Sequence, residues 1–234
     1  MEYLLVVLLF IAHLAIIKGI GKIQKILGVK STFKRLTISA PISISLSIIL
    51  IYLTDISFST AGFLIGDPLS GIFYILILGV PITLLLSLSF LKIPEEEVEN
   101  IITIGDDNPK LQLFYTWVLV GPVEEFLYRG FLQANLSTIM SGQIFTISYS
   151  TIIASLIFTS IHLVNVAAKE ESISQFIKQF PVRFIVAMIL GYTFQVTGSI
   201  IYPIIIHNIF DGSNFSVLFY RKKKSKQQSH SIHQ

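Results

Sequence analysis

The sequence contains no cysteine. This absence excludes disulfides, cysteine nucleophiles and thiolate-ligated metal sites. Charge is also scarce, since only 13% of the 234 residues are charged, whereas soluble domains have roughly 25%. Hydrophobic residues make up 53% of the chain, and several runs approach the roughly 18 to 25 apolar residues that a membrane helix needs. The sequence therefore predicts an all-α, polytopic transmembrane helical bundle.

About seven membrane spans are expected from the apolar segments, which charged or turn-rich residues separate. The first segment is expected to be a span and not a cleaved signal peptide, because Glu2 stands where a signal has basic residues. Lys18, Lys22 and Lys25 follow this segment in place of a small-residue cleavage site. The predicted spans cover residues 3–20, 37–54, 71–91, 111–136, 142–168, 180–198 and 200–220.

Lysine and arginine alternate between the connecting segments. They fall in the first, third and fifth loops and in the tail, and the second, fourth and sixth loops contain none. Lys18 and Arg183, at the edges of the spans 3–20 and 180–198, are counted with the adjacent loops, and Lys178 with the fifth loop, so that Arg129 is the basic residue counted inside a predicted span. Because Lys- and Arg-rich loops face the cytoplasm, we expect the amino terminus outside and the carboxyl terminus in the cytoplasm.

Six ionisable side chains at span depth need an explanation. Each would be costly against lipid, so each should face the bundle interior and find a partner. His13 also lies within a span, but alone, and we expect it to make a polar contact between helices. The six are Glu124, Glu125, Arg129, His162, His207 and Asp211.

Helix geometry separates the two neighbouring glutamates. Glu125 and Arg129 are four residues apart on one face, with the glutamate on the amino-terminal side, which favours an ion pair. Glu124 lies about 100° around the helix from Glu125 and is left available. The structural alternative is a charge network that does no more than hold the bundle together.

Two further pairs have the same spacing, Phe158 with His162 and His207 with Asp211, so each pair shares a helical face. A glutamate beside two neutral imidazoles suits hydrolysis: the carboxylate takes a proton from water and an imidazole polarises the carbonyl. Alternatively, the two histidines and a carboxylate could hold Zn²⁺ with a position open for water. These residues do not choose between the two schemes. Asn208 should point to a different face from His207.

Three sequence segments together resemble the motifs of one protein family. EEFLYR (124–129), FTSIH (158–162) and HNIFD (207–211) are similar to the motifs EExxxR, FxxxH and HxxxN/D of the type II CAAX prenyl protease family. This family is also called the CPBP or Abi intramembrane protease family. The resemblance covers roughly residues 110–220, and it implies an endopeptidase that acts on membrane-associated substrates from a site open to the cytoplasm.

The resemblance also implies roles for the site residues. Glu124 would activate water with His162, while His207 and Asp211 would bind the oxyanion or complete the site. Arg129 could instead contact a substrate carboxylate. Structural support would come from Glu125, Arg129 and Phe158.

The family has been described both as metal-dependent and as metal-free. The expected cofactor is therefore either none or a divalent metal such as Zn²⁺, held by Glu124, His162 and His207. Residues 1–109 would form amino-terminal spans and an acidic cytoplasmic loop, residues 110–220 the catalytic core, and residues 221–234 a basic, disordered cytoplasmic tail against anionic lipid.

Two other functional classes use the same polar cluster. One is a non-catalytic membrane protein of immunity or bacteriocin self-protection. The other is a proton-coupled transporter, against which the lack of an internal repeat counts. The expected partners are membrane lipids and a membrane-associated peptide or protein substrate, with no nucleic acid. The expected location is the cell membrane, as a multi-pass protein.

Overall fold

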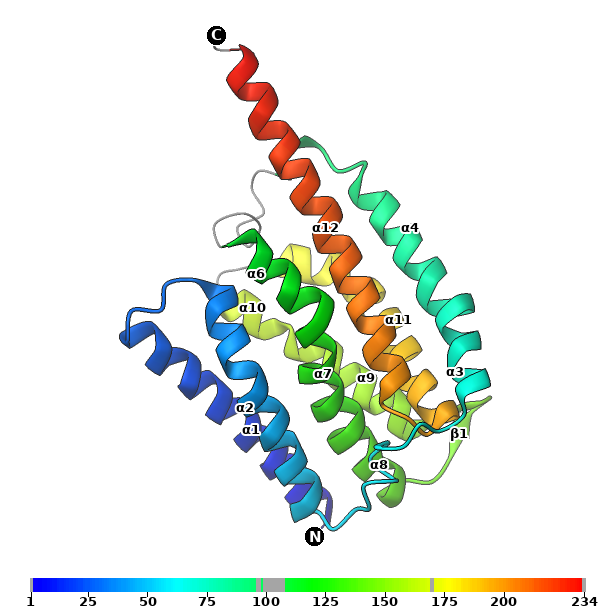
Figure 1. The fold of residues 1–234 in the computed structure, drawn as a ribbon. Coiled ribbons are helices and arrows are strands. Elements are labelled where there is room, and N and C mark those ends of the chain that lie inside the picture. Colours follow the sequence, from blue (N-terminus) through cyan, green and yellow to red (C-terminus); the bar gives the residue numbers. More distant parts are fainter. Residues whose placement is uncertain (1, 96–97, 99–107, 169–170, 233–234) are drawn as a thin grey trace.

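The computed structural model describes residues 2–95, 98, 108–168 and 171–232, and in them the chain is almost entirely helical, as predicted (Figure 1). A two-stranded hairpin interrupts the helices, with Gln143 paired to Ser148 and Ile144 to Ile147 in antiparallel register. The amino-terminal half contains α1 (Glu2–Ile26), α2 (Thr32–Leu53), α3 (Pro68–Tyr74), the π-helix η1 (Ile75–Gly79) and α4 (Val80–Phe90).

One continuous rod then passes through the middle of the bundle in Figure 1. It consists of α6 (Pro109–Phe114), η2 (Tyr115–Leu119), α7 (Val120–Glu125), η3 (Phe126–Gln133) and α8 (Ala134–Ile139). The hairpin of β1 (Gln143–Ile144) and β2 (Ile147–Ser148) follows this rod. The chain continues with α9 (Tyr149–Ile161), α10 (Leu163–Ala167), α11 (Ile173–Thr197) and α12 (Ile201–Ile232).

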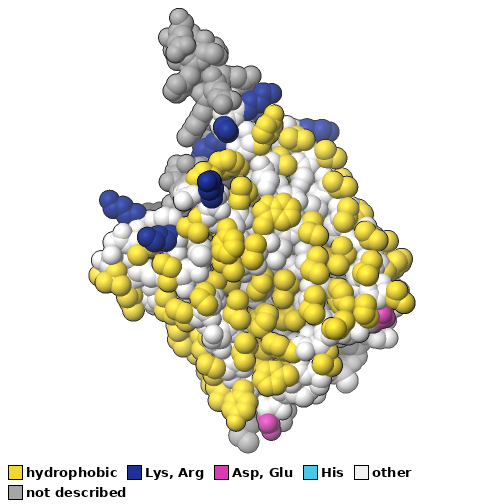
Figure 2. Space-filling view, in the orientation of Figure 1, with side chains coloured by type: hydrophobic (Ala, Val, Ile, Leu, Met, Phe, Trp, Pro, Cys, Tyr) yellow, Lys and Arg dark blue, Asp and Glu magenta, His cyan; other side chains and the backbone are white. Residues whose placement is uncertain are grey.

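Exposed apolar side chains cover most of the face shown in Figure 2, with Lys and Arg gathered towards one end of it. Five helices are long and apolar enough to cross a membrane: Tyr3–Ile26, Thr32–Leu53, Pro68–Phe90, Tyr149–Ala167 and Ile173–Thr197. The rod of 109–139 and α12 fall outside this group, because they carry the glutamates, Arg129, His207 and Asp211. The protein is therefore a membrane protein, and the expected count of seven spans depends on these two polar helices.

The structure moves several predicted boundaries. The hairpin takes the start of the predicted span 142–168, so α9 begins only at Tyr149, and α2 begins at Thr32 and not at 37. Two further displaced segments are basic. Helix α1 continues to Ile26, so Lys18, Lys22 and Lys25 lie in its last turns and not in a loop. Helix α11 begins at Ile173, which places Lys178 and Arg183 inside a helix. Both lysine and arginine can lie along apolar surface through their methylene stems while the charged end reaches polar surroundings, so a charge did not end either helix.

The start of α11 has a local cause in its first turn. Ser172 Oγ accepts a hydrogen bond from the Gln175 backbone N–H at 3.2 Å, and Gln175 Oε1 accepts one from the Ser172 N–H at 2.8 Å. This reciprocal capping satisfies backbone donors that the helix itself leaves free. The cap therefore begins the helix well before Pro181, and the sequence-based boundary at 180 is wrong.

The structure tests the prediction for the carboxyl-terminal tail but not the one for the acidic loop. Where disorder was expected, α12 continues to Ile232. Arg221 on this helix donates from Nη1 to the carbonyl oxygen of Phe90 at 3.0 Å and also to that of Ile93, which ties α12 to the end of α4. Most of the acidic loop of 92–110 lies outside the described residues.

The central rod is the element against which the rest of the bundle packs. On one side, Leu127 and Phe131 are buried in a core with Ile51 of α2 and Ala154 of α9. On the other side, α12 packs against α7 and η2, and α11 packs along α9. His13 of α1 contacts Ser43 Oγ of α2 through Nε2 at 3.1 Å, so the polar contact expected for this histidine is confirmed. This packing brings residues 124–129, 158–162 and 207–211 to one region.

Candidate active site

A buried ion pair stands at the centre of the site. Arg129 Nε donates to Glu125 Oε2 at 3.0 Å, and both side chains are completely enclosed. Arg129 Nη2 also donates to the Ala187 carbonyl oxygen of α11 at 3.2 Å. The predicted pair of Glu125 and Arg129 is thus confirmed. Because it has no access to solvent, removing one partner would leave an uncompensated buried charge.

The second oxygen of Glu125 contacts an imidazole from a distant part of the chain. Glu125 Oε1 lies 2.8 Å from His207 Nδ1, with both groups buried. A carboxylate accepts hydrogen bonds, so Nδ1 carries the proton and Nε2 is turned away from Glu125. Glu125 therefore fixes both the position and the tautomer of His207, a contact that the sequence analysis did not anticipate.

The free side of His207 is directed at two further carboxylates. Its Nε2 lies 3.7 Å from Glu124 Oε2 and 3.6 Å from Asp211 Oδ2. The side chains of Glu124 and Asp211 are 30% and 25% exposed, whereas that of His207 is only 5% exposed. We call Glu124, Glu125, His207 and Asp211 the acidic–histidine cluster. Glu124 and Asp211 are partly accessible to solvent, whereas Glu125 is fully buried.

His162 approaches the cluster through an aromatic ring. Its Nδ1 lies 2.9 Å from the Phe158 carbonyl oxygen, so Nδ1 is the donor and Nε2 keeps its lone pair. The Phe158 ring centroid lies 5.3 Å from the ring of His162, 6.1 Å from that of His207 and 5.2 Å from the Arg129 guanidinium carbon. Phe158 therefore contacts both histidines. Glu124 was expected to lie beside both histidines. The structure shows a contact of Glu124 with His207 and none with His162.

A three-ligand metal site does not fit this arrangement in the described residues. No three of their His, Asp and Glu side chains are placed so as to hold one ion. Glu124 and His207 approach each other, whereas the hydrogen bond of His162 is to the Phe158 carbonyl oxygen and its ring packs on that of Phe158. The expected set of Glu124, His162 and His207 is thus not assembled as a metal centre here.

Gly121, Pro122 and Asn208 hold α7 against α12 beside the cluster. Proline has no backbone N–H, so Pro122 cannot bond the carbonyl of Val118, four residues earlier. Asn208 supplies both missing partners: its Oδ1 accepts from the Gly121 N–H at 2.9 Å, and its Nδ2 donates to the Val118 oxygen at 3.4 Å. A Cβ atom on residue 121 would lie 2.6 Å from Asn208 Oδ1, so glycine is needed there.

Asn208 is the residue whose use the sequence analysis missed. It points to a different face from His207, as expected, but this face is the one that packs on α7. A proline two residues before an acidic pair, together with an Asn next to the histidine, is the signal that could have suggested such a bridge. The bridge fixes the relative height of Glu124 and His207, since both lie within four residues of its ends.

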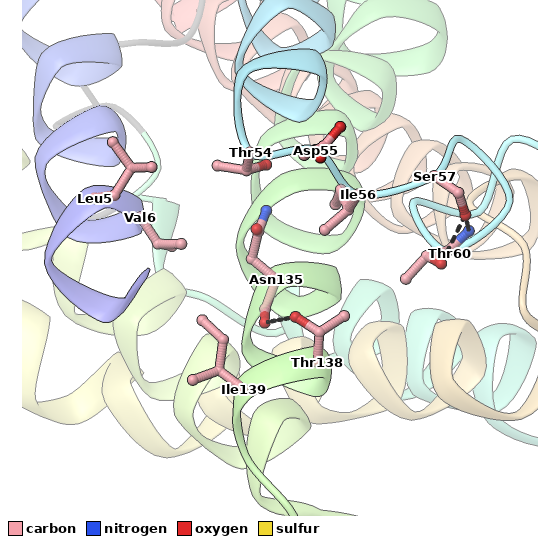
Figure 3. A pocket seen from close by; sticks show the side chains of 10 residues that line it. All are labelled: Leu5, Val6, Thr54, Asp55, Ile56, Ser57, Thr60, Asn135, Thr138 and Ile139. Carbon is pink, nitrogen blue, oxygen red and sulfur yellow. Dashed lines mark hydrogen bonds between the residues drawn. The ribbon is translucent and has the colours of Figure 1, made fainter. Parts of the chain in front are cut away.

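The two described cavities lie away from the cluster. One, of about 500 Å³, is formed by α1, the segment after α2 and α8, with Thr54, Asp55 and Asn135 among its lining residues (Figure 3). The other, of about 390 Å³, adjoins it near Thr60 and Gln133. Neither cavity contains a residue of the acidic–histidine cluster. Chemistry at the cluster therefore depends on the partial exposure of Glu124 and Asp211.

Comparison with known proteins identifies one match. The family model described as "Type II CAAX prenyl endopeptidase Rce1-like" matches residues 106–213. The matched range contains all three motifs and ends two residues after Asp211. No curated protein and no solved structure matches the chain.

Proposed function

Residues 106–213 belong to the type II CAAX prenyl endopeptidase Rce1-like family, and from this premise we propose that the protein is a membrane-embedded endopeptidase whose water nucleophile is activated by Glu124. The single observation that carries the proposal is the contact of Glu124 with His207. A partly exposed carboxylate lies 3.7 Å from an imidazole nitrogen whose partner nitrogen is fixed by a buried carboxylate.

In the proposed reaction, Glu124 accepts a proton from water as the water oxygen attacks the scissile carbonyl carbon. In this step His207 is the imidazolium, protonated at both nitrogens: Nδ1–H donates to Glu125 and Nε2–H donates to the tetrahedral oxyanion, while the charge of Glu125 balances that of the imidazolium. When the carbon–nitrogen bond breaks, Glu124 returns its proton to the leaving amine. General acid–base transfer of this kind contributes roughly 10²- to 10⁴-fold to a rate.

The remaining residues have supporting roles in this proposal. His162 presents the lone pair of Nε2, which can accept a hydrogen bond from the attacking water. Asp211 lies 3.6 Å from His207 Nε2, the nitrogen that Glu125 does not contact, and holds the imidazole in place through its charge. Arg129 keeps Glu125 ionised in the interior, and the chain needs no nucleophilic serine or cysteine for this route.

The proposed substrate is a membrane-associated peptide or protein. A prenylated carboxyl-terminal segment is the substrate class that the family description names. The family has also been treated as metal-dependent, and a bound divalent ion would polarise the carbonyl or the water. The steps above use only the side chains of this chain.

Cleavage of a quenched fluorescent peptide by purified protein tests the proposal. Peptides with and without a prenylated cysteine should be compared in detergent micelles or proteoliposomes. We expect turnover by the wild type and its loss in Glu124→Gln, with an unchanged unfolding temperature. Equal turnover in the two proteins would rule out Glu124 as the base.

A further inference from the structure

Arg183 lies on the face of α11 that is turned towards the site. Four residues after it, the Ala187 carbonyl accepts hydrogen bonds from Arg129 Nη2 at 3.2 Å and from Ser155 Oγ at 3.1 Å. Residues four apart on a helix share a face and differ in height by about 6 Å. Arg183 is thus one helical turn away from the carbonyl that anchors the buried arginine.

His162 is the neighbour of Arg183 on the packed helix. It lies seven residues after Ser155, which is two turns along the same face of the α9 segment. Helix α10 follows this segment before α11 begins, and α9 and α11 pack against each other. Starting from the contact of Ser155 with Ala187, both His162 and Arg183 therefore lie towards the same end of the two packed helices. Arg183 and Glu171 both interact electrostatically with the His162 imidazole.

The guanidinium of Arg183 is held in place but is not fully used. Its Nη2 donates to Glu171 Oε2 at 3.1 Å and to Gln179 Oε1 at 2.6 Å. Its Nη1 is buried and has no hydrogen-bond partner among the described residues, and the same holds for Glu171 Oε1. Buried polar groups are normally paired, and a buried donor without a partner is costly. Such a donor beside a candidate active site indicates a place for a ligand oxygen.

Arg129 cannot serve this purpose. Its Nη1 is also buried without a hydrogen-bond partner among the described residues, but its side chain is fully enclosed, whereas the side chain of Arg183 is 20% exposed. The alternative in which Arg129 contacts a substrate carboxylate therefore fails on access. Arg183 is the arginine near His162 whose side chain is partly exposed; its Nη1 is itself buried, so the guanidinium must turn to meet an incoming group.

We propose that Arg183 binds the carboxyl-terminal carboxylate of the peptide substrate through Nη1, beside His162. A guanidinium matches the geometry of a carboxylate and bonds to it more strongly than to a neutral group. Glu171 and Gln179 orient the guanidinium by holding Nη2. The inference rests on the proposed endopeptidase function and specifies which end of the substrate the site recognises.

Three matched peptides test this recognition by kinetics. The first ends in a free carboxylate and the second in a carboxyl-terminal amide. The third also ends in an amide, but its last residue is an aspartate, which supplies a side-chain carboxylate. The peptides are otherwise identical. Wild-type protein should cleave the free acid at least tenfold more efficiently than the plain amide, mainly through a lower KM, because a bond to a charged group is worth about this much. Arg183→Gln should bring the ratio of acid to amide close to one, and Arg183→Lys should keep part of it.

Lys178→Gln is the matched control, because it removes the same charge from an exposed position on the same helix. This variant should keep the wild-type ratio of acid to amide. A ratio that persists in Arg183→Gln, or that is already one in the wild type, would overturn the proposal. Preference for the aspartyl amide over the free acid would also overturn it, since the recognised carboxylate would then be a side chain.

A binding measurement separates this proposal from the proteolytic function. The Glu124→Gln variant, which should not cleave, is titrated with fluorescent acid and amide peptides, with and without Arg183→Gln. At least tenfold tighter binding of the acid, lost on changing Arg183, supports recognition even if no cleavage is ever found. If binding instead follows the fraction of anionic lipid and ignores the peptide terminus, Arg183 meets a lipid phosphate and the proposal is wrong. Unfolding temperatures of all variants identify any that fail to fold.

Discussion

Glu125 joins Arg129 and His207 into one buried unit: its two oxygens lie 3.0 Å from Arg129 Nε and 2.8 Å from His207 Nδ1. The unit connects two helices that are 82 residues apart in sequence at this contact. Arg129 supplies the charge that keeps the carboxylate ionised, and the carboxylate orients the imidazole. A charge pair that looks purely structural in the sequence thus also positions a candidate catalytic group.

Arg129→Leu should destabilise the protein strongly. The variant leaves Glu125 buried without its cation, and breaking a buried pair in this way costs about 3–5 kcal/mol. Thermal unfolding in detergent would measure the loss. The double variant Glu125→Gln with Arg129→Leu should recover part of it, because no uncompensated charge is left.

Lys30→Leu provides the control for this experiment, since Lys30 is exposed. Its replacement should change stability by less than about 0.5 kcal/mol. If Arg129→Leu proved as mild as Lys30→Leu, the buried pair would contribute little to folding and its description as a support would be wrong.

Gly121→Ala should separate α7 from α12. The added methyl group would meet Asn208 Oδ1 at 2.6 Å and the Ile204 carbonyl oxygen at 2.8 Å, both closer than real contacts allow. Overpacking of this kind costs typically about 1–3 kcal/mol. Because the shift would move Glu124 relative to His207, peptide cleavage should fall by more than the loss of stability explains.

Gly19→Ala is the matched control, because a Cβ atom there meets nothing within 4 Å. Alanine favours a helix over glycine by up to about 1 kcal/mol, so this variant should be neutral or slightly stabilising. A Gly121→Ala protein with wild-type stability and cleavage would show that the two helices are not held as closely as the structure indicates.

Removal of divalent metal should leave peptide cleavage largely intact. The reason is the placement of the ligands, since no three carboxylates or imidazoles of the described residues are grouped so as to hold one ion. Elemental analysis of active protein, together with assays before and after chelation, would measure this. A stoichiometric metal whose loss and restoration track activity would require the side chains to rearrange around it.

The expected orientation can be tested by introducing single cysteines, because the chain has none of its own. The substitution Ser59→Cys lies in the segment between α2 and α3, and Lys30→Cys in the segment between α1 and α2. With the amino terminus outside, a membrane-impermeant thiol reagent should label the Ser59→Cys variant in intact cells. The Lys30→Cys variant should react only after permeabilisation. The reverse pattern would mean that the distribution of lysine and arginine does not determine the orientation here.

The features that depend on local helix geometry were predictable from the sequence. The pair of Glu125 and Arg129 follows from a spacing of four, and the all-α class from long apolar runs. The shared face of His207 and Asp211 follows from the same rule and is seen as their 3.6 Å contact. These statements need only one helix at a time.

Contacts between helices were not predictable in the same way. The hydrogen bond of His207 with Glu125 depends on how α12 is rotated and raised against α7, which Gly121 and Asn208 set through backbone contacts. Helix ends were misplaced where charged side chains lie within a helix, as at Lys25 and Arg183. The hydrophobic periodicity of a sequence describes one helix at a time, whereas the site is built from the central rod, α9, α11 and α12.

The most direct test of the central claim compares Glu124→Gln with Asp55→Asn in peptide cleavage. Each variant removes one accessible carboxylate, and Asp55 lies far from the cluster, among the residues that line the cavity in Figure 3. Glu124→Gln should lower kcat by at least about 10²-fold while its fold and peptide binding are retained, and Asp55→Asn should cleave like the wild type. Cleavage by Glu124→Gln at the rate of Asp55→Asn would contradict the assignment of Glu124 as the group that activates water.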